Sequence, residues 1–332
     1  MQNLITDVPG LSVGHAQDTA VASGVTVIVF DAPAAASVAI HGGGPAVRDT
    51  ALLEPQASVE TVDAIVLSGG SAFGLDAAGG VMAHLAGIGR GFQVGDVRVP
   101  IVPGASVFDL AVGRGAWGPS PPWWELGFQA AASAARSFAL GSVGGGTGAT
   151  VANLKGGLGS ASAVTAAGFA VGAIVVVNAV GTVTIGDTGH FWAAADEVGA
   201  EFGGLGAMVH VPETARSPAI KGDAHPRANT TIALVATDAV MPKSALKHTA
   251  VMAHDGMARA IRPSHAPLDG DLVFAAATGV SGRTPDLRQR ADIGHVAAQC
   301  LSRAIARAVF EATALPYPQA LPSYQDRFGR KK

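Results

Sequence analysis

Residues 228–238 of the chain are Ala228-Asn229-Thr230-Thr231-Ile232-Ala233-Leu234-Val235-Ala236-Thr237-Asp238. From Thr230 onward nearly all of them are apolar or β-branched, a composition typical of a buried strand. The residues before them, 221–227, are polar and turn-prone, so we expect a loop that leads into the strand. The pattern therefore places a threonine hydroxyl at the first position of a rigid strand.

This placement suits a nucleophile that cleaves its own chain. The Thr230 hydroxyl can attack the carbonyl of Asn229, shift the acyl group from nitrogen to oxygen, and leave an ester for water to hydrolyse. The new chain begins at Thr230, and its α-amine can act as the base for the neighbouring hydroxyl. An α-amine has a reference pKa of about 7.7–8.0, so a useful fraction is neutral near pH 7. The plainer interpretation is an ordinary junction between a loop and a strand, because threonine favours strands.

The composition indicates a large buried core and a modest polar surface. Of the 332 residues, 48% are hydrophobic and 14% are charged, and the net charge is −3. Without a basic run before Arg330-Lys331-Lys332, nucleic acid is not an expected partner. The single Cys300 excludes an intrachain disulfide framework. The apolar stretches are too short to span a bilayer and no signal peptide is visible, so we expect a cytoplasmic protein without membrane contact.

The hydrophobic pattern groups strands and helices without strict alternation. It predicts strands at residues 24–30, 37–40, 64–68, 170–178 and 272–278, and a strand pair at 93–102. It predicts helices at 72–86, 127–138 and 242–261, and a last helix with Thr284 as N-cap and Pro285 at its first position. Apolar strands with one-faced helices indicate two packed sheets with helices outside. No repeat or linker divides residues 1–332, so a single domain is expected.

Two glycine-rich stretches invite comparison with known motifs. Gly144-Gly145-Gly146-Thr147 lacks the last glycine of a dinucleotide loop and the end of a P-loop, so no nucleotide cofactor is predicted. Backbone N–H groups of such a loop can still line a substrate cleft, which makes these four residues candidates for substrate binding. In Gly69-Gly70-Ser71-Ala72-Phe73, Phe73 replaces the last glycine of a hydrolase nucleophile elbow. We therefore interpret Ser71 as a helix cap.

Four further polar residues are candidates for chemistry. Asp269 and Asp271 are at i, i+2 and point to one side of an extended chain, where they could hold the new α-ammonium or shuttle its proton; a solvated turn is the alternative. Asn178 ends an apolar strand and could donate to an oxyanion or act as a structural cap. Lys155 could orient a nucleophile or lie on the surface. The ten histidines show no zinc-protease spacing, so no metal is predicted.

Taken in order, these residues resemble the L-aminopeptidase/D-esterase (DmpA-type) family, which includes β-peptidyl aminopeptidases and the nylon-6 oligomer endo-hydrolase. The resemblance covers nearly the whole chain and rests on an ordered set of segments. They are the opening Ile5-Thr6-Asp7-Val8-Pro9-Gly10-Leu11-Ser12-Val13-Gly14-His15, the glycine loop followed by Lys155, Val177-Asn178, Asn229-Thr230-Thr231, and Asp269-Gly270-Asp271 after Pro263-Ser264-His265.

The resemblance implies an α/β fold, a four-layer αββα sandwich, made as a precursor that cleaves itself into residues 1–229 and 230–332. It implies a tetramer of cleaved protomers that hydrolyses small amides without a cofactor. It makes Thr230 the nucleophile, Asn178 the oxyanion donor, Lys155 a supporting cation, and Asp269 and Asp271 the acidic pair near the new amine.

The substrates implied are amino-acyl amides, peptides or 6-aminohexanoate oligomers. The aminopeptidase branch has serine as nucleophile and a Ser-x-Glu pair. Thr230 and the Asp-Gly-Asp sequence therefore favour the nylon-oligomer branch.

Two rival functions remain open at this stage. An acyltransferase of the ornithine-acetyltransferase type shares the threonine self-cleavage, but its nucleophile follows Met-Ala, where this chain has Ala228-Asn229. A non-catalytic protein that binds ligands through its glycine loop would stay a single chain, inert to amides.

Overall fold

The computed structural model describes residues 1–113, 117–217, 219–221, 229–317 and 320–329. Its strands are β1 (Leu11–Asp18), β2 (Ser23–Ile40), β3 (Ala46–Arg48), β4 (Thr61–Ser68), β5 (Phe92–Val94), β6 (Val97–Val99), β7 (Gly104–Ser106), β8 (Gly157–Val164), β9 (Ala170–Asn178), β10 (Thr230–Thr237) and β11 (Leu272–Ala277). Its α-helices are α1 (Ser71–Gly74), α2 (Ala77–Gly87), α3 (Trp123–Ala132), α4 (Lys243–Ala260), α5 (Leu287–Phe310) and α6 (Tyr324–Phe328).

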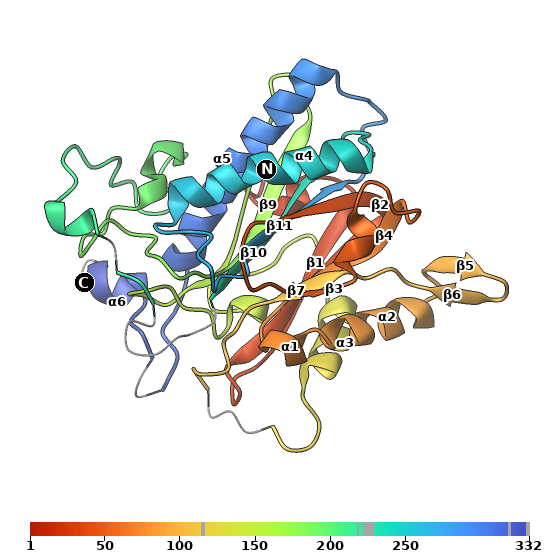
Figure 1. The fold of residues 1–332 in the computed structure, drawn as a ribbon, viewed down its shortest axis with the longest axis horizontal. Coiled ribbons are helices and arrows are strands. Elements are labelled where there is room, and N and C mark those ends of the chain that lie inside the picture. Colours follow the sequence, from red (N-terminus) through yellow and green to blue (C-terminus); the bar gives the residue numbers. More distant parts are fainter. Residues whose placement is uncertain (114–116, 218, 222–228, 318–319, 330–332) are drawn as a thin grey trace.

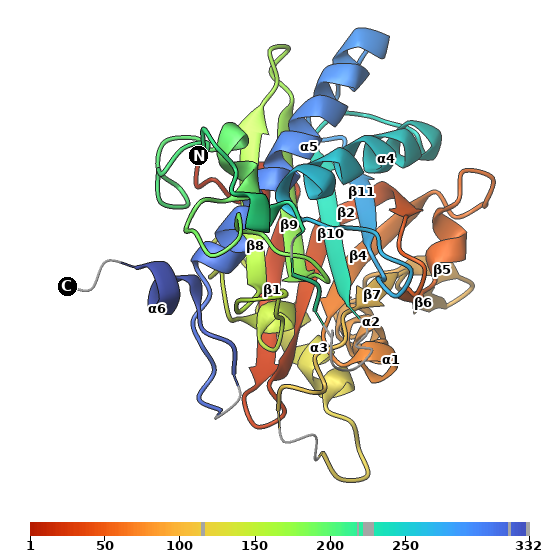
Figure 2. The same cartoon turned by 60° about the vertical axis from the view of Figure 1, so that its left-hand side comes forward.

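Strand β2 is shared by two layers of sheet. Along the chain of hydrogen-bonded neighbours the order is β3-β7-β4-β2-β11-β10-β9-β8. The first half of β2 pairs antiparallel with β1, and its second half pairs antiparallel with β11. Both partners need the edge of β2 that β4 leaves open, so the sheet divides there (Figure 2). The two predicted sheets are thus present as layers, but β2 joins them by continuous hydrogen bonding.

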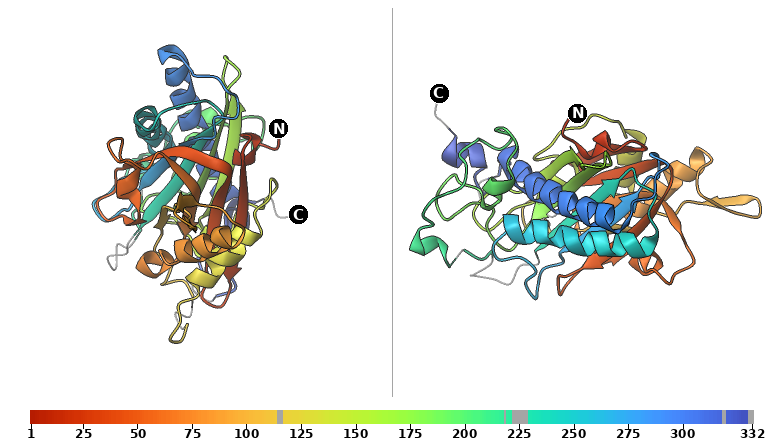
Figure 3. Two further views of the ribbon diagram at one scale, coloured as in Figure 1. Left: turned by 90° about the vertical axis from the view of Figure 1, so that its right-hand side faces the viewer. Right: turned by 90° about the horizontal axis from the view of Figure 1, so that it is seen from above.

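Three separate apolar cores define four layers. One core packs β1, β2 and β4 against α2 and α3. A second core lies between the layers and takes residues from β1, β2, β4, β9, β10 and β11. A third core packs β8–β11 against α4 and α5. Figures 1 and 3 show the corresponding arrangement, with α4 and α5 side by side over one sheet layer and α1–α3 on the opposite side. This confirms the predicted αββα sandwich.

Strand β10 lies in the middle of the sheet layer that α4 and α5 cover. It pairs antiparallel with β9 and parallel with β11. Ile232 and Leu234 face the core between the layers, whereas Ala233 and Val235 face the helices. A strand buried on both faces has an almost uninterrupted apolar sequence, and that explains the composition of residues 230–237.

Several predicted elements are confirmed with small changes of boundary. The strand at 170–178 matches β9, and the strands at 64–68 and 272–278 match β4 and β11. The strands at 24–30 and 37–40 are parts of the single strand β2. The helix predicted at 72–86 is broken into α1 and α2, and the one predicted at 127–138 is α3, which begins and ends earlier.

Two predicted helix caps are wrong. Asp286, and not Thr284, is the N-cap of α5, because its carboxylate accepts from the Gln289 N–H at 2.8 Å while the Gln289 side chain accepts from the Asp286 N–H at 3.0 Å. These two reciprocal hydrogen bonds form a capping box, which satisfies the backbone N–H groups of both residues at the first turn of α5. Ser71 is the first residue of α1, and Gly70 with φ 86° is the N-cap.

Two further expectations concern the polar loop at 221–227 and membrane-spanning segments. Of the polar loop predicted at 221–227, Lys221 is described and the rest lies outside the described residues. Among the helices of the described ranges, none combines the length and the apolar character needed to cross a membrane.

The core between the layers generates the first prediction. Leu234 is fully buried there, so Leu234→Ala is expected to lower the free energy of unfolding by about 2–5 kcal/mol. Urea unfolding followed by circular dichroism measures the change. Val251→Ala, at a residue of α4 that is 40% exposed, is the control and should change it by less than about 0.5 kcal/mol. Equal effects of the two substitutions would contradict the layered core.

Candidate active site

Thr230 begins β10 and is buried in the intact chain. Its register partner on β9 is Asn178, and only 4% of its surface is exposed. Its hydroxyl donates to the carbonyl oxygen of Asn229, the residue before it. The hydroxyl therefore lies beside the peptide group that self-cleavage would break.

The Asn229 carbonyl has a second donor, from the loop that precedes β11. The Gly270 N–H donates to it at 2.9 Å, and Asn229 forms a parallel bridge with Asp269. A Cβ at position 270 would lie 2.7 Å from Thr230 Oγ1 and 3.0 Å from its Cγ2. Glycine is therefore required at this position, since any side chain would push the hydroxyl away. The sequence pattern pointed to Asn178 as an oxyanion donor and missed this backbone N–H.

Asp269 is buried and only partly satisfied. Its Oδ2 accepts from the Ala266 N–H at 2.9 Å, while its Oδ1 has no hydrogen-bond partner among the described residues. Burial raises the pKa of this carboxyl to about 7, and the negative charge of Asp271 adds to the rise. Near neutral pH this carboxyl can therefore take up or release a proton.

Asp271 connects the strand that begins at Thr230 to a histidine. Its Oδ1 accepts from the Thr231 N–H at 2.7 Å. Its Oδ2 accepts from the backbone N–H of His265 and lies 2.9 Å from His265 Nδ1. The acidic pair is thus no solvated turn, because both carboxyls are buried and each holds backbone N–H groups.

Asn178 is fully buried and hydrogen-bonded on both sides of its amide. Its Oδ1 accepts from the Thr150 N–H at 3.0 Å and from Lys221 Nζ at 2.8 Å. Its Nδ2 donates to the Phe108 carbonyl at 3.0 Å, which uses one of its two protons. The side chain therefore holds three segments together beside Thr230, and its second N–H proton makes no hydrogen bond to the described residues.

Lys155 lies inside the glycine loop, where its ammonium donates to the carbonyls of Gly146, Ala149 and Gly156 at 2.8–2.9 Å. Three acceptors use all three of its protons. Burial lowers its pKa to about 7, and the charge of the buried Asp109 offsets part of that fall. The surface alternative is wrong. Lys155 is buried and holds the glycine loop through these three carbonyls.

The glycine loop itself is buried. Gly144–Gly146 form a short 3-10 turn; the Gly144 N–H donates to Gln17 Oε1 and the Gly145 N–H to Thr26 Oγ1, both at 3.1 Å. Thr147 donates to the Gly144 carbonyl. These contacts are internal, so the predicted role in substrate binding stays a prediction.

The structure brings together Thr230, Asn178, Asp269 and Asp271, and it joins Lys155 to them through the loop. It adds Gly270, Lys221 and His265, which the sequence patterns missed. His265 stands six residues before Asp271, but no spacing rule links a loop histidine to a carboxylate. A cavity of about 670 Å³ lies elsewhere, lined by residues such as Ser58, Thr61 and Phe92, and contains none of the candidates.

The αββα sandwich and the family match that follows together make the protein a peptide-bond hydrolase. The chain belongs to peptidase family S58, whose family model matches residues 3–320. An uncharacterized aminopeptidase of Mycobacterium tuberculosis is 41% identical, with 98% of each chain covered. An uncharacterized aminopeptidase of Mycobacterium leprae is 40% identical, with 98% of this chain and 94% of the relative covered.

Solved structures share the fold. The β-aminopeptidase of a Burkholderia species has a TM-score of 0.71 at 22% identity, and the match covers 98% of this chain and 92% of that one. The L-aminopeptidase D-Ala-esterase/amidase of Ochrobactrum anthropi, described as a variant of the Ntn hydrolase fold, has a TM-score of 0.70 at 19% identity with the same coverage. At these identities the likeness establishes the architecture.

The two carboxyls generate a prediction about pH. We expect the pH profile of kcat/KM to show an ionisation near pH 7 from Asp269, with activity rising as its carboxyl loses its proton. Asp269→Asn should remove that ionisation. Asp271→Asn should move it to lower pH, because the charge of Asp271 raises the pKa of Asp269.

Asp31→Asn, at an exposed residue on β2, is the control for a general charge effect. A profile that keeps the same ionisation in all three variants would exclude Asp269 from proton transfer.

Asn178 generates a third prediction, which separates a catalytic from a structural role. If its Nδ2 donates to an oxyanion, Asn178→Ala should lower kcat by about 10²–10³. The same change removes the acceptor of the Thr150 N–H and one of the acceptors of Lys221, so a fall in Tm is expected as well. Asn178→Asp keeps Oδ1 as acceptor for the Thr150 N–H and Lys221 and removes the donor, including the one to the Phe108 carbonyl, so it should lower kcat as much. Unchanged kcat in this second variant would leave only the structural role.

Proposed function

We propose that this peptidase is a self-processing amidohydrolase whose nucleophile is Thr230, released as an N-terminal residue by cleavage after Asn229. The observation that carries the proposal is the geometry of the Asn229–Thr230 peptide group. Its carbonyl oxygen accepts from the Gly270 N–H at 2.9 Å and from the Thr230 hydroxyl. Donors at this distance stabilise negative charge on the oxygen as it develops.

The proposed cleavage proceeds in two steps. Thr230 Oγ1 attacks the carbonyl carbon of Asn229, and the oxyanion that forms stays within reach of the Gly270 N–H. The C–N bond then breaks as the nitrogen of Thr230 takes up the proton that Oγ1 has lost, which leaves an ester between the carbonyl carbon of Asn229 and Oγ1. Water hydrolyses the ester, giving the carboxylate of Asn229 and the free hydroxyl of Thr230. Residues 230–332 then form a separate chain.

Turnover uses the same atoms on an external amide. The neutral α-amine of Thr230 accepts the proton of Oγ1 as the hydroxyl attacks the substrate carbonyl, and returns it to the departing amine. Water then attacks the ester on Thr230 and releases the acid. Asp269, with its pKa near 7, exchanges protons with the amine, and Asp271 holds the backbone of Thr231 in place.

The proposed substrates are amino-acyl amides, peptides and 6-aminohexanoate oligomers. The names of the relatives support amino-terminal peptide bonds. Thr230 with Asp269-Gly270-Asp271 supports the oligoamides. We further propose an assembly of cleaved protomers, a tetramer by resemblance. The projecting hairpin of β5 and β6 supports association, because it exposes Phe92, Val94 and Val97 (Figure 1).

The prediction that tests the proposal replaces the nucleophile. The unchanged chain should give two bands on a denaturing gel, and the smaller should begin Thr-Thr-Ile-Ala-Leu. The fragments should stay together, because β10 pairs with β9 and β11 pairs with β2 across the cleavage. Thr230→Ala should give one folded chain without amidase activity, since a single hydroxyl serves both reactions.

Thr231→Val is the matched control. It removes a neighbouring hydroxyl that has no hydrogen-bond partner in the described parts of the chain, and it should cleave and turn over normally. Amide hydrolysis by an uncleaved chain would show that the base is not the amine of Thr230. Acyl transfer to added ornithine in place of hydrolysis would favour the acyltransferase, and an intact inert chain would favour a binding protein.

A further inference from the structure

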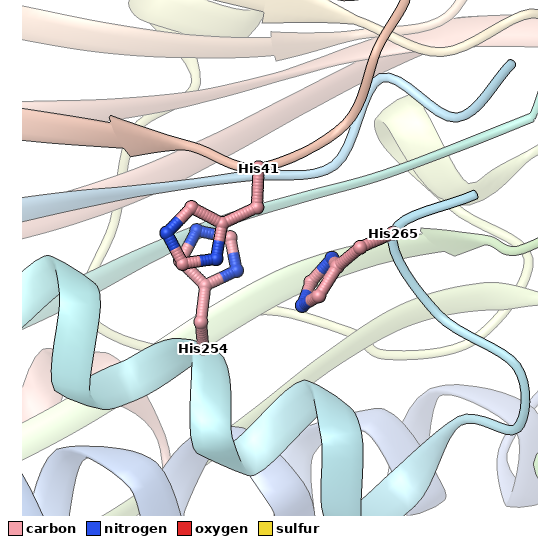
Figure 4. A group of neighbouring side chains, drawn as sticks. All are labelled: His41, His254 and His265. Carbon is pink, nitrogen blue, oxygen red and sulfur yellow. The ribbon is translucent and has the colours of Figure 1, made fainter. Parts of the chain in front are cut away.

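Three histidines gather beside Asp271, away from the nucleophile itself. They are His41 in the loop after β2, His254 on α4 and His265 in the loop before β11 (Figure 4). One ring nitrogen from each lies within 4.8 Å of those from the other two. The rings of His41 and His254 stack with centroids 3.7 Å apart, and His265 stands edge-on to both.

The hydrogen bonds of His254 show which of its nitrogens is free. Its Nε2 lies 3.0 Å from the carbonyl oxygen of Ala39, which can only accept, so Nε2 carries the proton. Its Nδ1 therefore holds a lone pair, and this buried atom has no hydrogen-bond partner within the described ranges. His254 is 3% exposed, so this lone pair is buried beside the other two rings.

His265 has the same arrangement with a stronger acceptor. Its Nδ1 lies 2.9 Å from Asp271 Oδ2, so the ring donates from Nδ1 and keeps the lone pair on Nε2. A histidine that binds a metal ion characteristically donates its other N–H to a carbonyl or a carboxylate, which fixes the ring and makes it a better ligand. His254 and His265 each have that support before any ion is present.

We propose that His41, His254 and His265 form a binding site for one divalent transition-metal ion of the zinc type. Three imidazoles with an open fourth position form a common tetrahedral zinc site, whereas calcium and magnesium prefer oxygen ligands. Zn–N distances are about 2.0–2.1 Å, which puts tetrahedral ligand atoms about 3.4 Å apart. The nitrogens must therefore draw closer, and His41, which is exposed, is the ring that leaves its stack to do so.

The site goes beyond the proposed hydrolase function but shares one residue with it. Asp271 holds His265 with one carboxylate oxygen and the Thr231 N–H with the other. An ion bound at His265 is therefore one hydrogen-bonded carboxylate away from the strand that carries the nucleophile. Because no metal ligand is a proposed catalytic residue, ion binding does not require Thr230.

The test measures binding of Zn²⁺ and Co²⁺ to the full chain without a histidine tag, after removal of metal by a chelator. Calorimetry should show one Zn²⁺ per chain, and Co²⁺ should give the visible absorption of a tetrahedral nitrogen site. His41→Ala removes an exposed ligand and should weaken binding at least about tenfold. Zn²⁺ should raise the Tm of the unchanged protein, and it should raise that of His41→Ala by less at the same concentration.

His248→Ala, an exposed histidine on the same helix α4, is the matched control and should bind as the unchanged chain does. Thr230→Ala should also bind normally, so failure of the hydrolase proposal would leave this result intact. Equal affinity of the unchanged chain and His41→Ala, or the absence of a one-to-one complex, would overturn the site.

Discussion

The hydrogen bonds between residues 229–231 and the Asp269-Gly270-Asp271 loop are the constraint on which the site depends. The Gly270 N–H holds the carbonyl of Asn229, and Asp271 Oδ1 holds the N–H of Thr231, at 2.9 Å and 2.7 Å. Between these two points the backbone at Thr230 has little freedom. A β-branched side chain adds few rotamers, and the missing Cβ at Gly270 leaves room for the hydroxyl. The position of the Thr230 hydroxyl thus follows from backbone pairing more than from its own side-chain contacts.

Buried polar groups around this constraint are costly unless they are satisfied. A lysine ammonium moved into the interior loses its hydration, and Lys155 recovers part of it through three carbonyl acceptors and the nearby charge of Asp109. Asn178 uses the same strategy with three partners from different segments. These hydrogen bonds hold loops in place. Glycines in these loops pack so closely against neighbouring atoms that a side chain would not fit. At Gly146, for example, a Cβ would lie 2.3 Å from the Leu158 nitrogen.

The sequence predicted the fold class and the central strands because two-sided burial leaves a plain signal. Strands β9 and β10 are apolar on both faces, and the helices α4 and α5 have clear apolar faces. Strands β1 and β8 were not predicted, since glycine and polar residues interrupt them, and pairing across the sheet decides their conformation. The division of β2 between two layers likewise has no local signal.

The candidate site, like the fold, could be predicted from the sequence only in part. Thr230, Asn178, Lys155, Asp269 and Asp271 were found as residue types in a suggestive order, but their partners are distant in sequence. The Gly270 N–H is a backbone group, which no residue type identifies. His41, His254 and His265 come from three separate segments and follow no ligand spacing, so only the folded chain brings their nitrogens together.

Asp271 links the candidate active site to the three histidines, because each oxygen of its carboxylate has a different hydrogen-bond partner. One oxygen orders the backbone of the strand that carries Thr230, and the other orients His265. A carboxylate shared in this way cannot strengthen one hydrogen bond without weakening its attraction for the other donor. The charge that it adds also raises the pKa of Asp269. An ion at the proposed histidine site would therefore be linked to the acidic pair through a single side chain.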